Sequence, residues 1–447
     1  MTKDLHDITN KTIKLAQKKG ADFSEAFLIK GNRISIEIED SSIVKANNQS
    51  VSGIGMRIIK DKAVALGSST QFQHSLLDNM VKEAVLLAKA SSADPAIIGL
   101  AEPIDSYPEV KGLYDKKLAA LNSSELVDLA ITGINAAHEI NKEIKLEGQL
   151  VVSDIQNYLA NNNGIDLHSA KTSINFYLQG KLAKSDDDIG VAYELQFGRH
   201  LADVDPAEVG RIAAEKTIKM LGAKKIDSGE YPFILDERAA RRTINGIIDK
   251  GISAYNIDQG TAYFTDRLGE QIASNKLTVL DNPLEKGGYN STPYDDEGTA
   301  CSKKVLVENG TLLTYLSDVY TSHKLDIPNT GSAQKRGYDG IPHPKLQQIQ
   351  IQGGSASKDE LFSELDTGLY LESPLMAMTG TNISQQVDVG FWVEQGEIQF
   401  PVKNTMLGTT VYEVLQNIQM LGKNVLDESG LKSPMVLIGK TKFSGGK

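Results

Sequence analysis

The stretch YDDEGTACSKKVLVENGTLLTYLSD, residues Tyr294–Asp318, decides the fold of the second half of the chain. Its two apolar runs are separated by Asn309 and Gly310. An Asn-Gly pair between apolar runs is the strongest short-range signal for a β-hairpin. The stretch therefore predicts two antiparallel strands joined by a tight turn, preceded by a loop that contains three consecutive acids.

A second stretch, GFWVEQGEIQFPV at 390–402, repeats this design with Gln395 and Gly396 at the turn. Between and after the hairpins, two segments carry helical patterns. We therefore predict a C-terminal domain dominated by antiparallel sheet, covering residues 223–447. Its helices are expected near 358–365 and 411–422.

The N-terminal half, residues 1–222, combines helices with a sheet. Ile34, Ile36 and Ile38 alternate with polar residues, a period of two that marks a half-buried strand. Two blocks, 1–100 and 117–222, repeat a helix-and-strand pattern loosely. The fold class is therefore predicted to be α+β. The predicted elements are helices at 2–19, 72–90, 122–140, 205–222 and 238–250, and strands at 33–40, 145–153, 173–182 and 190–197. Two further strands are predicted within 53–67, joined around Lys60 to Lys62.

Capping residues support two of these helices. Asn122 is followed by Glu125, and Asp205 by Pro206 and Glu208, which are the residue types that begin helices.

Composition restricts the partners and the location. The 447 residues include 40% hydrophobic and 23% charged residues, as in a globular chain. The formal net charge of −11 disfavours nucleic acid as a partner. No apolar run is long enough to span a bilayer, so no membrane partner is expected. The single cysteine cannot form an internal disulfide, and a cytoplasmic location is expected.

Motifs for hydrolytic chemistry are missing from the sequence. The His138-Glu139 pair has Lys142 where the second histidine of a zinc-binding HExxH helix would stand, and an exposed helix end is the simpler interpretation. Cys301 has no neighbouring histidine to activate it, so a structural cysteine at a strand start is favoured. The other six histidines show no ligand spacing: His6, His74, His168, His200, His323 and His343.

The three acids Asp295, Asp296 and Glu297 allow more than one interpretation. Adjacent side chains on an extended chain point to opposite faces, which disfavours a catalytic carboxylate pair. A solvated turn, or carboxylates that cap backbone amides, is the favoured interpretation. A loop that faces a peptide or a partner remains a second interpretation. The later loop PNTGSA contributes Thr330 and Gly331, beside Asn329, to the same set of candidates.

Several motifs together resemble the TldD and PmbA (TldE) family, formerly called modulators of DNA gyrase. They are DDEGT, VLVENGTLLTYLSD, HKLDIPNTGSA, GFWVEQGEIQFPV and NTMLGTTVYEVLQNIQMLGKN, and the resemblance begins at GADFSEAFLIK. It covers essentially the whole chain. It implies a complex of two related chains that hydrolyses peptides. The TldD chain of that complex carries zinc on an HExxxH helix, with a cysteine nearer the C-terminus.

This chain departs from the TldD pattern at the metal site. The corresponding helix reads ERAARRTINGIIDKGISA and places Asn245, Gly246 and Lys250 at the positions of the two histidines and the glutamate. The C-terminal stretch GKNVLDESGLKSPMVLIG has no cysteine, and Cys301 lies in another motif. The chain therefore more closely resembles PmbA, the partner without a metal.

The resemblance implies a PmbA-like, non-catalytic subunit of a peptidase that acts on short or unfolded peptides. No cofactor is expected in this chain, and zinc is expected only in a TldD-type partner. A homodimeric peptide-binding or regulatory protein is the alternative. A metal-independent hydrolase that uses Asp295, Asp296 or Glu297 is a third, less favoured hypothesis.

Overall fold

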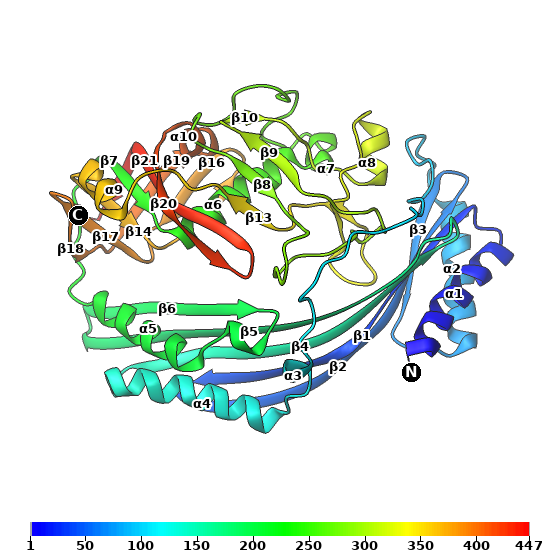
Figure 1. Ribbon diagram of the computed structural model, residues 1–447, viewed down its shortest axis with the longest axis horizontal. Helices are drawn as coiled ribbons and strands as arrows, with labels where there is room; N and C mark the ends of the chain where they lie inside the picture. The colour runs from blue at the N-terminus through cyan, green and yellow to red at the C-terminus, as the bar shows by residue number, and fades with distance from the viewer. Residues whose placement is uncertain (1, 447) are drawn as a thin grey trace.

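The computed structural model describes residues 2–446, which form two sheets with helices packed against them (Figure 1). Within these residues, the N-terminal region builds a six-stranded sheet and the C-terminal region builds a 13-stranded sheet. The predicted α+β class is confirmed. None of the helices in this range combines the length and the apolar character needed to cross a membrane.

The first sheet is antiparallel throughout and has the order β3-β2-β1-β4-β5-β6. The two blocks of the N-terminal half thus contribute three strands each to one sheet, joined where β1 pairs with β4. The strands are β1 (Phe23–Glu39), β2 (Ser42–Lys60), β3 (Ala63–Ser69), β4 (Lys145–Asn161), β5 (Asp166–Ser185) and β6 (Asp188–Gly198).

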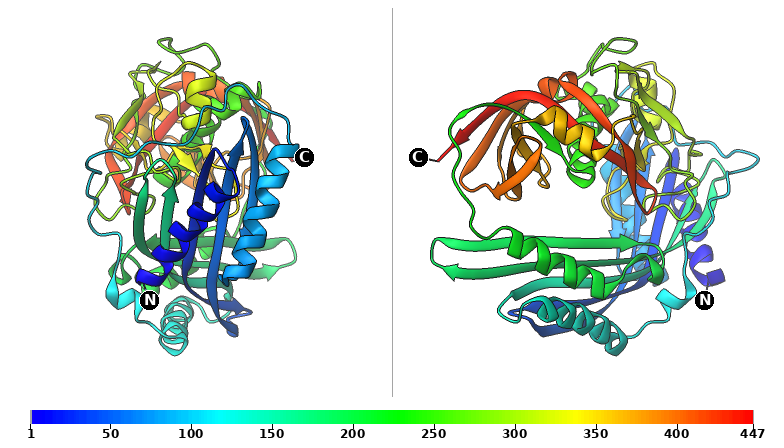
Figure 2. Two further views of the ribbon diagram at one scale, coloured as in Figure 1. Left: turned by 90° about the vertical axis from the view of Figure 1, so that its right-hand side faces the viewer. Right: turned by 60° about the vertical axis from the view of Figure 1, so that its left-hand side comes forward.

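The long strands of this sheet bend around the C-terminal domain, and the helices cover the outer, convex face (Figure 1). One half packs on α1 and α2 through a core that includes Leu28 and Val81. The other half packs on α4 and α5 through Ile36 and Phe176. The left view of Figure 2 shows α1 and α2 side by side in front of the strands. The helices of this region are α1 (Thr2–Lys18), α2 (His74–Ala90), α3 (Lys116–Ala119), α4 (Ser123–Ile140) and α5 (Pro206–Lys219), with a short 3₁₀ turn, η1 (Leu201–Asp203).

The predicted helix starts in the N-terminal half are confirmed. The Asn122 side chain accepts hydrogen bonds from the amides of Ser124 and Glu125, and the Glu125 carboxylate accepts one from the Asn122 amide. The Asp205 side chain caps α5 by accepting hydrogen bonds from the amides of Ala207 and Glu208, with Pro206 as the first residue of the helix. These caps satisfy amides that have no partner inside the helix.

The second sheet is mixed. Its main path runs β10-β9-β8-β13-β21-β7-β14-β17-β18, and β21 pairs parallel with β13 whereas β14 pairs parallel with β7. The other neighbouring strands described in this sheet pair antiparallel. The strands are β7 (Gly229–Leu235), β8 (Val279–Asp281), β9 (Lys304–Glu308), β10 (Thr311–Leu312), β13 (Ile349–Ile351), β14 (Gly368–Leu371), β15 (Met378–Thr379), β16 (Asn382–Gln386), β17 (Gly390–Glu394), β18 (Glu397–Pro401), β19 (Thr405–Thr410), β20 (Ile418–Glu428) and β21 (Leu431–Gly445).

Five helices and a small separate ribbon complete the described part of this domain. The helix α6 packs on β21. The helices are α6 (Glu237–Ile252), α7 (Ala254–Asp258), α8 (Val319–Lys324), α9 (Lys358–Leu365) and α10 (Val411–Gln416), and the ribbon pairs β11 (Ala333–Gln334) with β12 (His343–Pro344).

Both predicted hairpins are present. Asn309 and Gly310 join β9 to β10 with φ angles of 47° and 80°. Gln395 and Gly396 join β17 to β18 with φ angles of 53° and 75°. Consecutive positive φ angles give a turn whose twist matches that of the flanking strands.

The predicted helix at 411–422 is wrong in its second half. The helix α10 ends at Gln416, and Ile418 begins β20, which pairs antiparallel with β21. Ile418 and Leu421 are buried in the core of the C-terminal domain. Burial in this core and hairpin pairing with the next strand therefore override the local helical pattern.

Candidate functional site

Two clusters of charged side chains join the bent sheet to the C-terminal domain. The first lies at the end of the sheet formed by β1 and β2. Glu25 of β1 and Arg57 of β2 are direct neighbours across the two strands. Arg57 Nη2 lies 2.8 Å from Glu25 Oε2, and its Nη1 lies 2.8 Å from Glu297 Oε1 in the C-terminal domain.

Lys335 completes this cluster from the C-terminal side. Its ammonium forms an ion pair with Glu25 and lies 4.7 Å from the centre of the Phe27 ring. We call Glu25, Arg57, Glu297 and Lys335 the β1–β2 joint. Its two acids and two cations balance, and the four side chains are between 1% and 10% exposed.

The predicted acids lie at this joint, and the expectation of a solvated turn is wrong. Asp295 and Glu297 are 2% and 1% exposed. Asp295 Oδ1 accepts hydrogen bonds from the amides of Glu297 and Thr299, and its Oδ2 accepts one from Ala333. The alternative expectation, carboxylates that cap backbone amides, describes Asp295 correctly.

Asp296 is half-buried and accepts a hydrogen bond from the Lys335 amide at 2.7 Å. The Lys335 backbone and the Lys335 ammonium are therefore held by two different acids. The three predicted acids thus connect one loop to its neighbours, and Glu297 alone among them pairs with the N-terminal sheet in the described residues.

The structure brings the second predicted loop beside the first. Asn329 donates a hydrogen bond to the Thr299 hydroxyl, and Gly331 is so close to Ala300 that a Cβ atom would lie 2.6 Å from its carbonyl oxygen. Thr330 accepts a hydrogen bond from the Ser317 amide at 2.8 Å. The loops 295–301 and 329–335 therefore form one packed unit.

The pKa values of these acids are shifted in opposite directions, because burial raises all of them and the neighbouring cations reverse the effect only at Glu25. Burial raises the pKa of Glu297, and Arg57 only partly opposes this effect. Burial and the charge of Glu297 raise the pKa of Asp295 well above its usual range. Burial also opposes ionisation of Glu25, but Arg57 and Lys335 together hold the pKa of Glu25 below its usual range. Glu25 is therefore the acid whose charge the joint stabilises most strongly.

Glycines allow the C-terminal domain to contact the backbone of β2 beside this joint. A Cβ atom on Gly55 would lie 1.6 Å from the Tyr338 carbonyl oxygen, and one on Gly53 would lie 2.3 Å from the Tyr338 ring. Any other residue at either position would displace the loop that contains Tyr338.

Cys301 and His138 have structural environments. Cys301 is buried, and burial raises the pKa of its thiol to about 12, which suppresses the reactive thiolate. His138, near the end of α4, lies 3.1 Å from the Ile144 carbonyl oxygen and 3.2 Å from the Ser41 hydroxyl. It is half-buried, so the expected exposed helix end is only partly correct.

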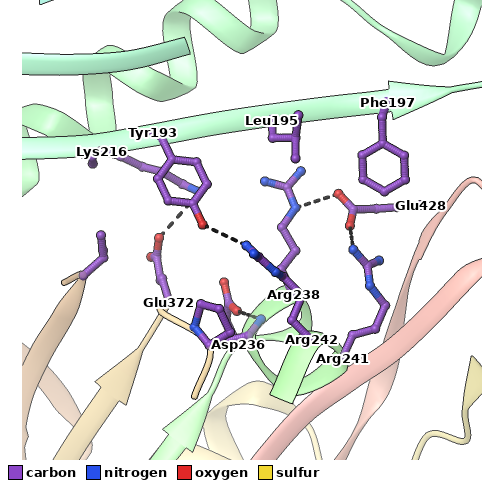
Figure 3. Close-up of a pocket in the computed structure, with 14 residues that line it drawn as sticks. Tyr193, Leu195, Phe197, Lys216, Asp236, Arg238, Arg241, Arg242, Glu372 and Glu428 are labelled. Atoms are coloured by element: carbon purple, nitrogen blue, oxygen red, sulfur yellow. Dashed lines mark hydrogen bonds and ion pairs between the residues drawn. The ribbon is translucent and has the colours of Figure 1, made fainter. Parts of the chain in front are cut away.

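The second cluster joins β6 to the first turns of α6, and Figure 3 shows three of its members, Arg238, Arg241 and Glu428, lining a pocket. The guanidinium of Arg238 pairs with Glu194 of β6 and with Glu428 of β20. Arg241 Nη2 also lies 2.7 Å from Glu428. We call Glu194, Arg238, Arg241 and Glu428 the β6 joint. Lys216 of α5 supports it with a 3.0 Å ion pair to Glu194.

Further along α6, one face of the helix is partly open. Asn245, Gly246, Asp249 and Lys250 are half-buried along it. The Lys250 ammonium lies 5.0 Å from the centre of the Tyr263 ring, and Asp249 accepts a hydrogen bond from the Leu346 amide at 2.6 Å.

This face does not fit a metal ion. In residues 2–446, no three histidine, cysteine, aspartate or glutamate side chains gather in a way that could hold one. The residue types on the open face of α6 agree with this, because an ammonium group repels a dication.

The same architecture occurs in known proteins. Three family models match the chain: the PmbA/TldA metallopeptidase domain 1 over residues 24–88, the central domain over 116–221 and the C-terminal domain over 228–445. The chain belongs to the PmbA/TldD family. The family resemblance inferred from the sequence is thereby confirmed.

Relatives in this family carry either of the two names. The chain is 26% identical to the metalloprotease PmbA homolog of Haemophilus influenzae, an alignment that covers 99% of this chain and 96% of that protein. It is 25% identical to the metalloprotease TldD homolog of Buchnera aphidicola, an alignment that covers 88% of this chain and 84% of that protein. Sequence identity thus does not separate PmbA-type from TldD-type relatives for this chain.

Solved structures share the fold. TldE from Thermococcus kodakarensis superposes with a TM-score of 0.89 at 22% identity, covering 98% of this chain and all of that one. A protein described as a putative modulator of a DNA gyrase, from Thermotoga maritima, superposes with a TM-score of 0.87 at 21% identity and covers 98% and 100%. Likeness at this identity establishes the family fold for this chain.

The sequence singled out some residues of the joints and missed others. Glu297 stood out because it belongs to a run of three acids. Glu25 and Arg57 did not, although each interrupts a mostly apolar strand, in SEAFLI and GMRII. An ionisable residue within a buried strand needs a partner, and this is the signal by which the pair could have been suspected.

Proposed function

We propose that this chain is a non-catalytic, PmbA/TldE-like subunit of a two-chain metallopeptidase that acts on short or unfolded peptides. The open face of α6 is the observation that carries the proposal. The family resemblance places HExxxH on this helix in TldD-type chains, and here the corresponding residues are Asn245, Gly246 and Lys250. Zinc would then be held only by the TldD-type partner.

The environment of these residues supports this assignment. The Lys250 ammonium lies over the Tyr263 ring, and the neighbouring acid on the helix, Asp249, accepts a hydrogen bond from the Leu346 amide. Without a metal, hydrolysis would need another way to activate water, and the buried thiol of Cys301 is not a nucleophile at neutral pH. The chain therefore contributes binding surface and shape to the complex, whereas its partner contributes the chemistry.

The test compares three samples on unfolded peptide substrates: this chain alone, an HExxxH-bearing relative from the same genome alone, and the mixture, each with and without a chelator. We expect cleavage by the mixture to exceed the sum of the separate samples and to be lost with chelator. We also expect elemental analysis of this chain to find far less than one zinc per chain.

Two results would count against the proposal. Chelator-resistant cleavage by this chain alone would show that it is an enzyme in its own right. A mixture no more active than the relative, with this chain running as a dimer that binds peptide, would favour the homodimeric binding protein.

A further inference from the structure

A cavity of about 420 Å³ lies next to the β1–β2 joint, where the N-terminal sheet meets α7 and α8. This volume is in the range of small-molecule sites. Ile59 of β2 and the segment 94–99 form one wall, and α7, α8 and residues 341–343 form the other. None of the residues on the open face of α6 lines the cavity, and nothing in the proposed two-chain function assigns a role to it.

Three of the four carboxylates that line the cavity already have partners. Asp258 lies 2.8 Å from the Lys324 ammonium, and Asp94 accepts a 2.7 Å hydrogen bond from the Tyr320 hydroxyl. Glu297 belongs to the balanced β1–β2 joint. These pairs leave no free charge for a ligand.

Asp318 is the exception. It is 3% exposed, and its Oδ1 accepts hydrogen bonds from both the amide and the hydroxyl of Thr321 as it caps α8. Its Oδ2 makes no hydrogen bond or ion pair with any residue in the range 2–446. Burial disfavours the charged form of this carboxylate and raises its pKa, and a cationic donor bound in the cavity would offset that cost.

The remaining surface of the cavity is largely apolar. Ile59 is buried, while Ile98 and Ile341 are 54% and 47% exposed and come from loops of different domains. His343 stacks on Tyr255 with ring centres 4.0 Å apart, and burial lowers the pKa of His343, which keeps it neutral. A ligand would thus meet the free oxygen of Asp318 and an apolar wall, while the two cations that line the cavity, Arg57 and Lys324, are already paired with acids.

We propose that this cavity binds a primary ammonium group carried on a short apolar stem, with the ammonium at Asp318 and the stem between Ile98 and Ile341. A metal ion is a poorer fit, because the lining acids do not gather as a metal-binding group in the described residues. The same chemistry occurs at the N-terminal residue of a peptide and in a free alkylamine.

Titration calorimetry of the isolated chain at pH 7 tests the proposal with three probes: leucinamide, N-acetyl-leucinamide and pentylamine. We expect leucinamide to bind at least about tenfold more tightly than its acetylated form, which lacks the charge. Pentylamine binding as tightly as leucinamide would support a general amine site. Binding of leucinamide alone would support the N-terminal residue of a peptide as the ligand.

Variants locate the site. Asp318→Asn should weaken leucinamide binding at least about tenfold, because asparagine still caps α8 but carries no charge. Asp205→Asn makes the same change at the cap of α5 and should leave binding unaltered. Ile98→Ser should weaken binding severalfold, whereas Ile131→Ser, at another exposed isoleucine on α4, should not.

Three results would overturn the proposal: equal binding of leucinamide and N-acetyl-leucinamide, equal binding by the parent and Asp318→Asn, or no binding of either amine at millimolar concentration. Because the experiment needs no second chain, its failure would leave the two-chain function untouched.

Discussion

The two joints use the same kinds of ion pair in different surroundings. In the β1–β2 joint, the one arginine is 10% exposed, and Glu297 has no second cation. In the β6 joint, Arg238 is 28% exposed, and each acid has a second cation, Lys216 for Glu194 and Arg241 for Glu428. The comparison teaches that the stability lost when one member of an ion pair is removed depends mainly on whether the remaining charge keeps another counter-ion or water.

Replacement of Arg57 by methionine should have the largest effect. Glu297 would keep only the Val319 amide, so Arg57→Met should lower the free energy of unfolding by about 3–5 kcal/mol. Arg238→Met should cost about 1 kcal/mol, because Glu194 and Glu428 keep other cations and water can enter. Urea denaturation at pH 7 measures both. If Arg238→Met costs as much as Arg57→Met, the difference between the joints does not exist.

The contact of β2 with the loop at Tyr338 should be nearly as sensitive. The added methyl group of Gly55→Ala would overlap the Tyr338 carbonyl oxygen, so we expect a loss of about 2–3 kcal/mol. Gly408→Ala in β19 is the matched control, because a Cβ atom there meets nothing within 4 Å. Thermal unfolding of both variants should show a lower Tm for Gly55→Ala only. Equal Tm values would mean that the loop does not rest on β2.

Replacement of an unpaired cation near the β1–β2 joint should increase the stability of the protein. Lys171 of β5 has no ion pair in the described residues, and burial lowers its pKa to about 8. Below pH 8, the folded protein bears the full cost of the buried charge; between pH 8 and about 10.5, the unfolded chain binds the extra proton, so parent stability rises with pH.

Lys171→Met should therefore stabilise the protein by about 2 kcal/mol at pH 7, and this advantage should vanish above about pH 10.5. Lys181→Met, at an exposed lysine of the same strand, is the control for the substitution. A destabilised Lys171→Met variant at pH 7 would show that the ammonium has a favourable partner.

The smallest predicted effect concerns Asp236, which lies in the pocket beside the β6 joint. Asp236 caps α6 by accepting a 2.6 Å hydrogen bond from the Ala239 amide, and burial raises its pKa to about 7. Because the folded-state pKa exceeds the unfolded value of 3.8, Asp236 costs stability as the pH rises from about 4 to 7. Asp236→Asn keeps the cap and should be about 1 kcal/mol more stable than the parent at pH 8, with no difference at pH 4. Chemical denaturation from pH 4 to pH 8 measures the difference in free energy of unfolding between Asp236→Asn and the parent, with Asp205→Asn as the control. A difference that does not change with pH would show that the pKa of Asp236 is not raised in the folded protein.

Local sequence patterns were sufficient for most of the elements. Two kinds of signal depend only on residues within one strand or one helical turn of each other. They are the alternation of Ile34, Ile36 and Ile38 and the helix caps at Asn122 and Asp205, and both can therefore be recognised from the sequence. The pairing of β1 with β4 and of β7 with β21 is not local, and this is why the sheet order could not be predicted. The helix at 411–422 was extended too far because burial of Ile418 and Leu421 in the core favours the hairpin strand β20 over the local helical pattern.

The site shows the same limit. The three acids of the 295–297 run were recognisable, but the buried charge of Glu297 depends on Arg57, which is 240 residues from it in the chain. The free oxygen of Asp318 depends on which neighbours its other oxygen and the nearby acids have engaged. The missing metal motif could be read from residue types on one helix, and this part of the interpretation needed no structure.

The position of β21 in the second sheet has a consequence for synthesis. This strand, residues 431–445, lies near the middle of the sheet and pairs with β7, β13, β19 and β20. While the ribosome is still making the preceding 200 residues, β7 lacks this neighbour and keeps an open edge. The N-terminal sheet has all six strands after residue 198, so it can form much earlier. The C-terminal domain therefore has unpaired strand edges until β21 has been synthesised. Chaperones that shield such edges should bind the nascent chain during the synthesis of the residues between β7 and β21.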